Sequence, residues 1–166
     1  MRSIRKGFTL VELMVVVIIL GVLTSMGVPY YLKTVESSKA MDAVAVTHMV
    51  GVATQMMMLD NPNMTYNGGA MSNVGGACPT SGARYGYDLV RCNYISRQDW
   101  TGMAYTIRSC NPNTGAGGTG CSGGITAHAK RKTGKYVGWT YWFTTAGECL
   151  RSPTVGALQA PSCPGF

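Results

Sequence analysis

The pattern of apolar positions changes along the chain, and each pattern predicts a different element. An almost unbroken apolar run occupies residues 8–28. A helix of this length would be ~32 Å long, which matches the hydrocarbon core of a bilayer. Pro29 follows the run and lacks the N–H that would bond to the carbonyl of Ser25, so we expect a kink there. The first pattern therefore predicts a membrane-spanning helix that starts near Phe8.

Residues 30–59 carry a second, amphipathic pattern. Apolar side chains recur at steps of three and four residues, at Ala43, Val46, Val50, Ala53 and Met57. This spacing predicts one helical face. The methionines at 49 and 56–58 are typical of core filling rather than of cofactor ligation. Because Pro62 disfavours helix at the residue before it, we expect the helix to end near residue 60.

Beyond the helix the chain has a loop pattern and then a strand pattern. Residues 61–82 are rich in Gly, Asn, Ser and Pro, which predicts a long surface loop, and residues 85–87 predict a short strand or a turn. Polar and apolar side chains alternate in residues 104–109 and 125–130, which predicts two strands. A glycine-rich connection, residues 111–124, lies between these strands.

A hairpin is predicted after the second of these strands. Thr133 and Gly134 would form its turn, and residues 135–145 would return as the second arm. One face of this arm would carry Val137, Trp139, Tyr141 and Phe143. The opposite face would carry Tyr136, Thr140 and Trp142. Alternating aromatic residues of this kind favour a core or a subunit interface over a ligand-stacking surface.

Together these patterns predict the fold class α+β. Three or more antiparallel strands can bury one face against the amphipathic helix of residues 30–59. We therefore expect a long N-terminal helix, hydrophobic and then amphipathic, packed on a C-terminal antiparallel β-sheet.

A single carboxylate, Glu12, lies near the start of the apolar run. A charge in hydrocarbon costs at least ~2.5–3.5 kcal/mol, so it normally marks function and implies a partner. Cleavage between Gly7 and Phe8 would create an α-amino group four residues before Glu12. The amine of a neighbouring copy would then neutralise Glu12 inside a shared apolar bundle.

The charge pattern orients the chain in a membrane. Net charge is +7, and three of the basic residues, Arg2, Arg5 and Lys6, precede the apolar run, which leaves +4 for the rest. Under the positive-inside rule this places the N-terminus in the cytoplasm and the remainder outside the inner membrane. A conventional secretory signal differs, because its apolar region precedes the cleavage site and ends in small residues.

Six cysteines follow the span: Cys78, Cys92, Cys110, Cys121, Cys149 and Cys163. Their even number and the lack of a Cys-Xaa-Xaa-Cys pair predict three disulfides in an oxidising compartment. The spacing does not choose among the connectivities, and sequential pairing is our hypothesis. His48 and His128 look isolated in the sequence, which predicts no metal site.

The sequence holds no nucleophile elbow, phosphate loop or paired carboxylates. We therefore expect neither enzymatic activity nor a cofactor. The acidic residues are scattered and predict no calcium loop. A basic cluster at the hairpin tip consists of Lys130, Arg131, Lys132 and Lys135. It is more typical of a solvated hairpin end, whose charges discourage edge pairing, and contact with DNA or an anionic surface is the alternative.

The junction Lys6-Gly7-Phe8 and the following Thr9-Leu10-Val11-Glu12 resemble the signature of the type IV pilin and pseudopilin family. The resemblance covers roughly residues 1–59. It implies cleavage after Gly7 by a prepilin peptidase, N-methylation of Phe8, and assembly into a helical filament. The partners it implies are further copies of the chain, the membrane before assembly, and the inner-membrane pilus assembly machinery.

The resemblance also implies a division of the chain. Residues 1–7 would be the leader, 8–29 the membrane and filament-core part of the helix, 30–60 its amphipathic part, and 61–166 the globular head. Filaments of the family often have an extended stretch between the positions matching Gly21 and Pro29, and an ordinary kink is the alternative. The Cys149–Cys163 pair resembles the C-terminal disulfide loop of many type IV pilins.

Three functions remain open at this stage. The chain is expected to be a structural pilus subunit, made as an inner-membrane prepilin and ending in an extracellular filament used for motility, adhesion, DNA uptake or secretion. The first alternative is a type II secretion pseudopilin in a periplasm-spanning pseudopilus. Major pseudopilins typically carry a C-terminal calcium site and lack disulfides, so the cysteines favour a pilus. The second is a minor pilin whose basic tip binds DNA or a surface.

Overall fold

A computed structural model of the chain describes residues 7–152 and 159–163. The predicted leader therefore lies outside the described residues except for Gly7. The chain divides into two compact units, Met1–Ser38 and Lys39–Phe166, and helix α1 (Leu10–Asp60) has residues in both. The helix ends at Asp60, two residues before Pro62, as the sequence predicts.

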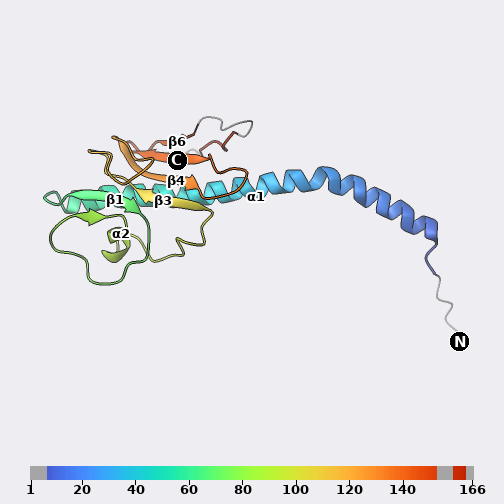
Figure 1. Ribbon diagram of the computed structural model, residues 1–166, viewed down its shortest axis with the longest axis horizontal. Helices are drawn as coiled ribbons and strands as arrows, with labels where there is room; N and C mark the ends of the chain where they lie inside the picture. The colour runs from blue at the N-terminus through green and yellow to red at the C-terminus, as the bar shows by residue number, and fades with distance from the viewer. Residues whose placement is uncertain (1–6, 153–158, 164–166) are drawn as a thin grey trace. The chain divides into compact units, whose positions relative to one another are not determined.

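The described residues of the second unit form a six-stranded sheet in the order β2-β1-β3-β4-β5-β6. Figure 1 labels β1, β3, β4 and β6 of this sheet. Its strands are β1 (Tyr66–Ala70), β2 (Arg84–Tyr85), β3 (Tyr105–Ser109), β4 (Ile125–Arg131), β5 (Thr140–Thr144) and β6 (Cys149–Arg151). The β1–β2 pair is parallel and every other pair is antiparallel. A short helix, α2 (Asp88–Arg91), follows β2. The predicted α+β class is confirmed.

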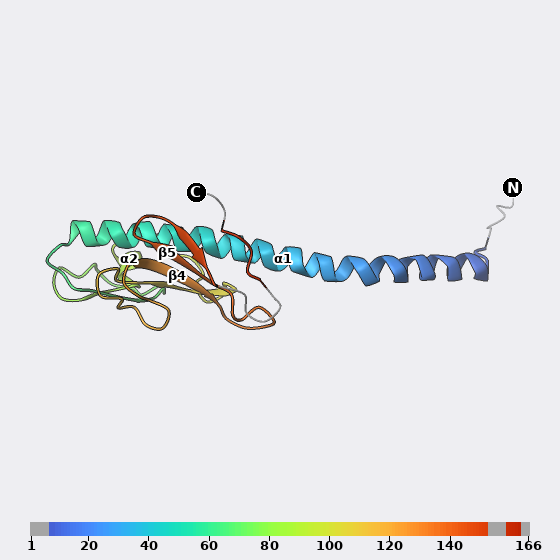
Figure 2. The ribbon, with the colours of Figure 1, turned by 90° about the horizontal axis from the view of Figure 1, so that it is seen from above.

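Within this unit, one face of α1 packs on the sheet, and Figure 2 shows β4 and β5 alongside the helix. Four of the five predicted face residues are buried, and Val46 is half-buried. Gly51 allows close contact, because a Cβ there would lie 2.8 Å from Thr126 Oγ1 on β4. Gln55 Nε2 also donates to the carbonyl of Thr145 at 2.8 Å. The amphipathic pattern therefore corresponds to a helix–sheet core.

The prediction that the methionines fill the core is right for only part of the set. Met57 is buried and Met58 is half-buried, whereas Met49 and Met56 are exposed. Successive helical residues point about 100° apart. Consecutive methionines therefore cannot all face the sheet.

The predicted hairpin is shorter than expected. Strands β3 and β4 form where predicted, but β5 begins at Thr140, and residues 133–138 form a wide turn. Val137 lies in this turn and is 48% exposed, so the prediction that it shares one strand face with Trp139, Tyr141 and Phe143 is wrong. Those three aromatic residues are buried, which agrees with the core environment expected for the alternating aromatic residues.

Strand β4 is buried on both faces rather than on alternate positions. All residues from Ile125 to Ala129 are buried. Helix α1 covers one face at Thr126, and the glycine-rich connection approaches the other at His128. Successive side chains of β4 therefore point to two faces that are both covered, rather than to one covered and one solvated face.

The loop predicted for residues 61–82 contains strand β1, so that assignment is wrong in part. The strand has the sequence Tyr-Asn-Gly-Gly-Ala, whose composition is typical of a loop. Gly68 has φ +62°, and a Cβ there would lie 2.6 Å from the carbonyl oxygen of Ser109 on β3. Glycine is therefore what lets β1 reach its neighbour. The short strand or turn predicted at residues 85–87 consists of the last residue of β2, Tyr85, followed by a turn at residues 86 and 87.

Candidate functional site

The segment Gly7–Glu12 forms the start of α1 through a reciprocal pair of contacts. The backbone N–H of Glu12 donates to Thr9 Oγ1 at 3.2 Å. In return, the backbone N–H and the hydroxyl of Thr9 donate to Glu12 Oε2 at 2.9 and 2.8 Å. This is a capping box, in which Thr9 is the N-cap and Glu12 lies three residues later. A carboxylate in the first turn is also favoured by the helix dipole.

The capping box gives Glu12 a second role that sequence reasoning did not assign. The signal was present, because a Thr followed three residues later by a Glu before an apolar run marks a helix start. Both Thr9 contacts use Oε2. In the described part of the chain, Oε1 accepts no hydrogen bond, so the carboxylate retains an acceptor for a further partner.

Gly7 and Phe8 precede the helix and are accessible. Nothing lies within 4 Å of a Cβ built on Gly7, and Phe8 is 83% exposed. A protease that cuts between them would meet exposed residues that precede the helix.

The first half of α1 exposes an apolar surface along its entire length. Every residue from Gly7 to Thr34 is exposed. Soluble monomers rarely expose apolar patches larger than a few hundred Å². By length and composition α1 is apolar enough to cross a membrane.

The helix is continuous through Gly21 and Pro29, so this single chain has no extended stretch there. Hydroxyl groups in this segment bond to the backbone of the preceding turn: Thr24 Oγ1 donates to the carbonyl of Leu20 at 2.8 Å, and Ser25 Oγ to that of Val22 at 2.7 Å. Such back-bonding satisfies polar side chains where no water is available. Extension of this stretch in a filament stays a prediction.

Comparison with known proteins bears on this segment. The model of the prokaryotic N-terminal methylation motif matches residues 2–28. The type IV major fimbrial protein FimA of Dichelobacter nodosus is 37% identical over 60 residues, and a second FimA of that organism is 44% identical over 46 residues. Over these N-terminal residues the chain is similar to type IV fimbrial proteins and to proteins with the prokaryotic N-terminal methylation motif.

The similarity to these pilins is confined to part of each chain. The first FimA match covers 36% of this chain and 38% of the relative, and the second covers 28% and 29%. The chain thus matches less than two fifths of the length of these curated relatives. No solved structure matches it.

The unit that contains the sheet, called the head below, is held by three disulfides, Cys78–Cys92, Cys110–Cys121 and Cys149–Cys163. This is the sequential order of our hypothesis. The first closes the segment that carries β2 and α2, the second closes the glycine-rich connection, and the third joins β6 to the chain near residue 163. All three lie in the unit that contains the sheet.

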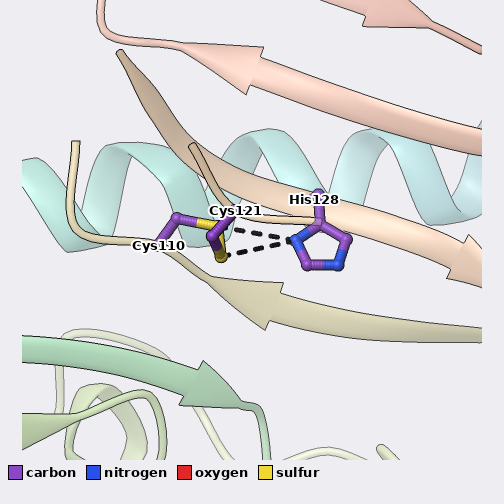
Figure 3. Close-up of side chains that lie close together, drawn as sticks. All are labelled: Cys110, Cys121 and His128. Atoms are coloured by element: carbon purple, nitrogen blue, oxygen red, sulfur yellow. Dashed lines mark hydrogen bonds between the residues drawn. A yellow bond between two sulfur atoms is a disulfide. The ribbon is translucent and has the colours of Figure 1, made fainter. Parts of the chain in front are cut away.

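His128 is not isolated, which corrects the sequence-based prediction. Its Nδ1 lies 3.5 Å from Cys110 Sγ and 3.7 Å from Cys121 Sγ (Figure 3). Burial, and then the positive charges of Arg108 and Lys130, lower the pKa of His128 to about 4. The imidazole is therefore neutral at physiological pH. Although these three side chains could form a metal-binding set, both sulfurs are joined in a disulfide and supply no thiolate.

Topology, rather than sequence spacing, brings this cluster together. Strand β4 carries His128, and the connection between β3 and β4 folds back over it. Gly120 has φ +100°, and a Cβ there would lie 2.8 Å from His128 Nε2. Trp142 Nε1 donates to the carbonyl of Gly120 at 2.9 Å and fixes the loop on the sheet.

The basic cluster at the hairpin tip is only partly available. Lys130 and Lys135 are exposed. Arg131 Nη1 donates to the carbonyl of Ala104 at 2.7 Å. Lys132 Nζ donates to the carbonyls of Trp100 and Thr101 at 3.3 and 2.7 Å. Two of the four cations thus hold the chain before β3 in place.

Proposed function

We propose that the chain is a structural subunit of a type IV pilus-like filament. The leader is removed after Gly7, Phe8 is N-methylated, and the subunit polymerises through the first half of α1. The observation that carries this proposal is the combination of an accessible Gly7–Phe8 junction with a capped carboxylate at the start of an uncovered apolar helix.

Cleavage supplies the partner that Glu12 needs. The new amine of Phe8 is positively charged, and the amine of an adjacent subunit would meet Glu12 in an apolar surrounding. An ion pair removed from water is favourable only where further hydrogen bonds satisfy the charged groups. The Thr9 contacts at Oε2 supply such bonds, and Oε1 accepts from the amine.

The exposed helix supplies the driving force for assembly. As a prepilin the apolar half lies in the inner membrane, and in the filament it packs against the same half of other copies. Neither environment requires a change in the head, because the covered half of α1 already has the sheet as its partner. This separation supports a subunit that moves from a membrane to an extracellular filament.

The experiment is intact-mass measurement of filaments sheared from cells that express the chain. The expected mass begins at Phe8, carries one added methyl group and lacks six hydrogens because of three disulfides. A chain that starts at Met1 would contradict the proposal. A processed chain found only in the membrane would contradict filament membership.

The two alternatives predict other results. A type II secretion pseudopilin would depend on calcium for stability of its head, so an unchanged unfolding midpoint in a chelator speaks for a pilus subunit. A minor pilin that binds DNA through Lys130 and Lys135 would bind in a salt-sensitive way. The internal contacts of Arg131 and Lys132 leave fewer charges for such binding.

A further inference from the structure

Arg84 on β2 is a buried cation with unusual neighbours. The residue is 4% exposed. Its Nη1 donates to both sulfurs of the Cys78–Cys92 disulfide, at 3.3 and 3.4 Å. Its other nitrogens donate to Met64 Sδ at 3.1 Å and to Asn61 Oδ1 at 3.3 Å. In the part of the chain that the structure describes, no carboxylate forms an ion pair with Arg84.

Three of these four acceptors are sulfurs, which are poor partners for a buried guanidinium, and the fourth is the neutral amide oxygen of Asn61. Arginine stays protonated in proteins, and a disulfide sulfur or a thioether is only a weak acceptor. A buried charge is normally paired, because its desolvation is costly. A thiolate at either cysteine would provide the missing negative charge, at a distance already suited to a charge-assisted hydrogen bond.

The other two disulfides lack this arrangement. The Cys110–Cys121 sulfurs face the neutral imidazole of His128. Among the described residues, no arginine or lysine donates to a sulfur of either remaining bridge. Arg151 lies near the third one, but its Nη1 donates to the carbonyl of Ala160 at 2.6 Å instead.

Access also distinguishes the first bridge. Cys78 is exposed and lies in an exposed run, residues 75–78, whereas Cys92 is half-buried beside α2. Cys110 is fully buried, and Cys149 and Cys163 are half-buried. An incoming thiolate therefore reaches Cys78 most directly.

We propose that Cys78–Cys92 is a thiol-exchange site of the head, reacting with thiol compounds, and that Arg84 holds the leaving thiolate. A thiolate attacks Cys78 Sγ, a new sulfur–sulfur bond joins it to Cys78, and the Cys78–Cys92 bond breaks. The electron pair goes to Cys92 Sγ, which becomes the thiolate beside Arg84 Nη1. A second thiol can attack the mixed disulfide, which releases the oxidised thiol and leaves both cysteines reduced.

Exchange rates depend on access to the attacked sulfur and on how well the leaving thiolate is stabilised. Both factors favour this bridge over the other two. The inference does not depend on filament assembly, because all of its residues lie in the second unit.

The test uses the full chain in detergent with reduced glutathione as the probe. Samples are trapped with iodoacetamide at intervals, and each cysteine is assigned by peptide mass spectrometry. Cys78–Cys92 should open at least about tenfold faster than the other bridges, with glutathione on Cys78 and the alkyl group on Cys92. Equal rates, or earlier opening of another bridge, would overturn the proposal.

Variants distinguish the effect of the Arg84 guanidinium on the exchange rate from the effect of access to the disulfide. Arg84→Gln should slow opening of this bridge about tenfold, Arg84→Lys should retain most of the rate, and the matched control Arg151→Gln should leave it unchanged. An unchanged rate in Arg84→Gln would contradict the role of Arg84.

A measurement on the unaltered chain covers the case in which Arg84→Gln does not fold. After opening by glutathione, the rate of Cys92 alkylation is followed against pH. Thiolates beside an arginine titrate below the ordinary value of about 8.5, so the midpoint should lie at or below about 7.5. A midpoint at 8.5 or above would overturn the proposal.

Discussion

The two halves of α1 are one continuous helix, yet they differ in almost everything that packing controls. From Gly7 to Thr34 every residue is exposed, whereas nine residues between Ala40 and Met57 are buried. The second half has a periodic apolar face and a sheet to cover it. The first half is apolar on all sides, and a helix of that kind is stable only in a core or a membrane.

The two halves of α1 therefore have partners of different origin. The second half finds its partner in the same chain, through β4 and β5. The first half needs a partner from outside, either lipid or further copies. In our proposal its single carboxylate takes part in that external contact, and Thr9 already holds the carboxylate in the single chain.

The substitution with the largest expected consequence is Glu12→Gln, which removes the proposed external contact of the first half of α1. Glu12→Gln leaves the Phe8 amine of a neighbouring subunit without its counter-charge, and loss of one partner of a buried pair costs ~3–5 kcal/mol. Filament yield should fall more than tenfold while the chain remains in the membrane, as measured by shearing and immunoblotting.

Thr9→Val is the matched variant for this experiment. It removes the helix cap, which is worth about 1 kcal/mol, and keeps the carboxylate. Its filament yield should fall much less than that of Glu12→Gln. Equal losses in the two variants would mean that Glu12 acts only as part of the cap.

The next substitution weakens the contact between the second half of α1 and the sheet. Met57→Ala should destabilise the head by ~2–5 kcal/mol, because it removes a buried side chain and leaves a cavity. Its neighbour Met56 is 54% exposed, and Met56→Ala should change stability by less than about 0.5 kcal/mol. Denaturant unfolding of the full chain in detergent measures both. Similar costs at the two positions would contradict the assigned helix face.

Acidification should weaken the sheet that covers the second half. The pKa of His128 is lowered from 6.5 to about 4 in the folded chain, so the unfolded chain binds the proton first. Stability should therefore fall as pH drops from about 6.5 towards 4, by up to about 3 kcal/mol, and level off below. His128→Gln should remove this slope, whereas His48→Gln should leave it. A slope that persists without His128 would refute this linkage.

The smallest change in stability is expected for glycine substitutions, and one glycine is compared from each half of α1. Gly51→Ala places a Cβ 2.8 Å from Thr126 Oγ1, so the head should lose about 1 kcal/mol. Gly21 has nothing within 4 Å of a built Cβ, and Gly21→Ala should leave unfolding of the head within about 0.5 kcal/mol. A larger cost at Gly21 would show that the first half contributes to head stability.

Much of the fold could be predicted from periodicity. The end of α1 at Asp60, its buried face, and strands β3 and β4 all carry local signals. Strand β1 could not be predicted, because its glycines read as loop and only pairing with β3 makes them a strand. Strand β6 has three residues and helix α2 has four, so both are too short to show a periodic signal.

The residues discussed as candidate sites also fall into two groups, those that a local motif identifies and those that only the fold brings together. The junction Gly7–Phe8 and Glu12 are close in sequence, so a motif finds them. The contacts of His128 and of Arg84 with disulfides join residues from different elements, and only the topology of the sheet reveals them. The capping role of Glu12 could have been predicted from Thr9, which lies three residues earlier. The same residues also belong to the family signature, and they were interpreted only in that sense.

A filament structure at a resolution that shows side chains would test the role of Glu12 in assembly. The Glu12 carboxylate is expected within about 4 Å of the Phe8 amine of another subunit, with Thr9 still bonded to Oε2. A Glu12 that faces solvent or contacts only its own chain would contradict this role.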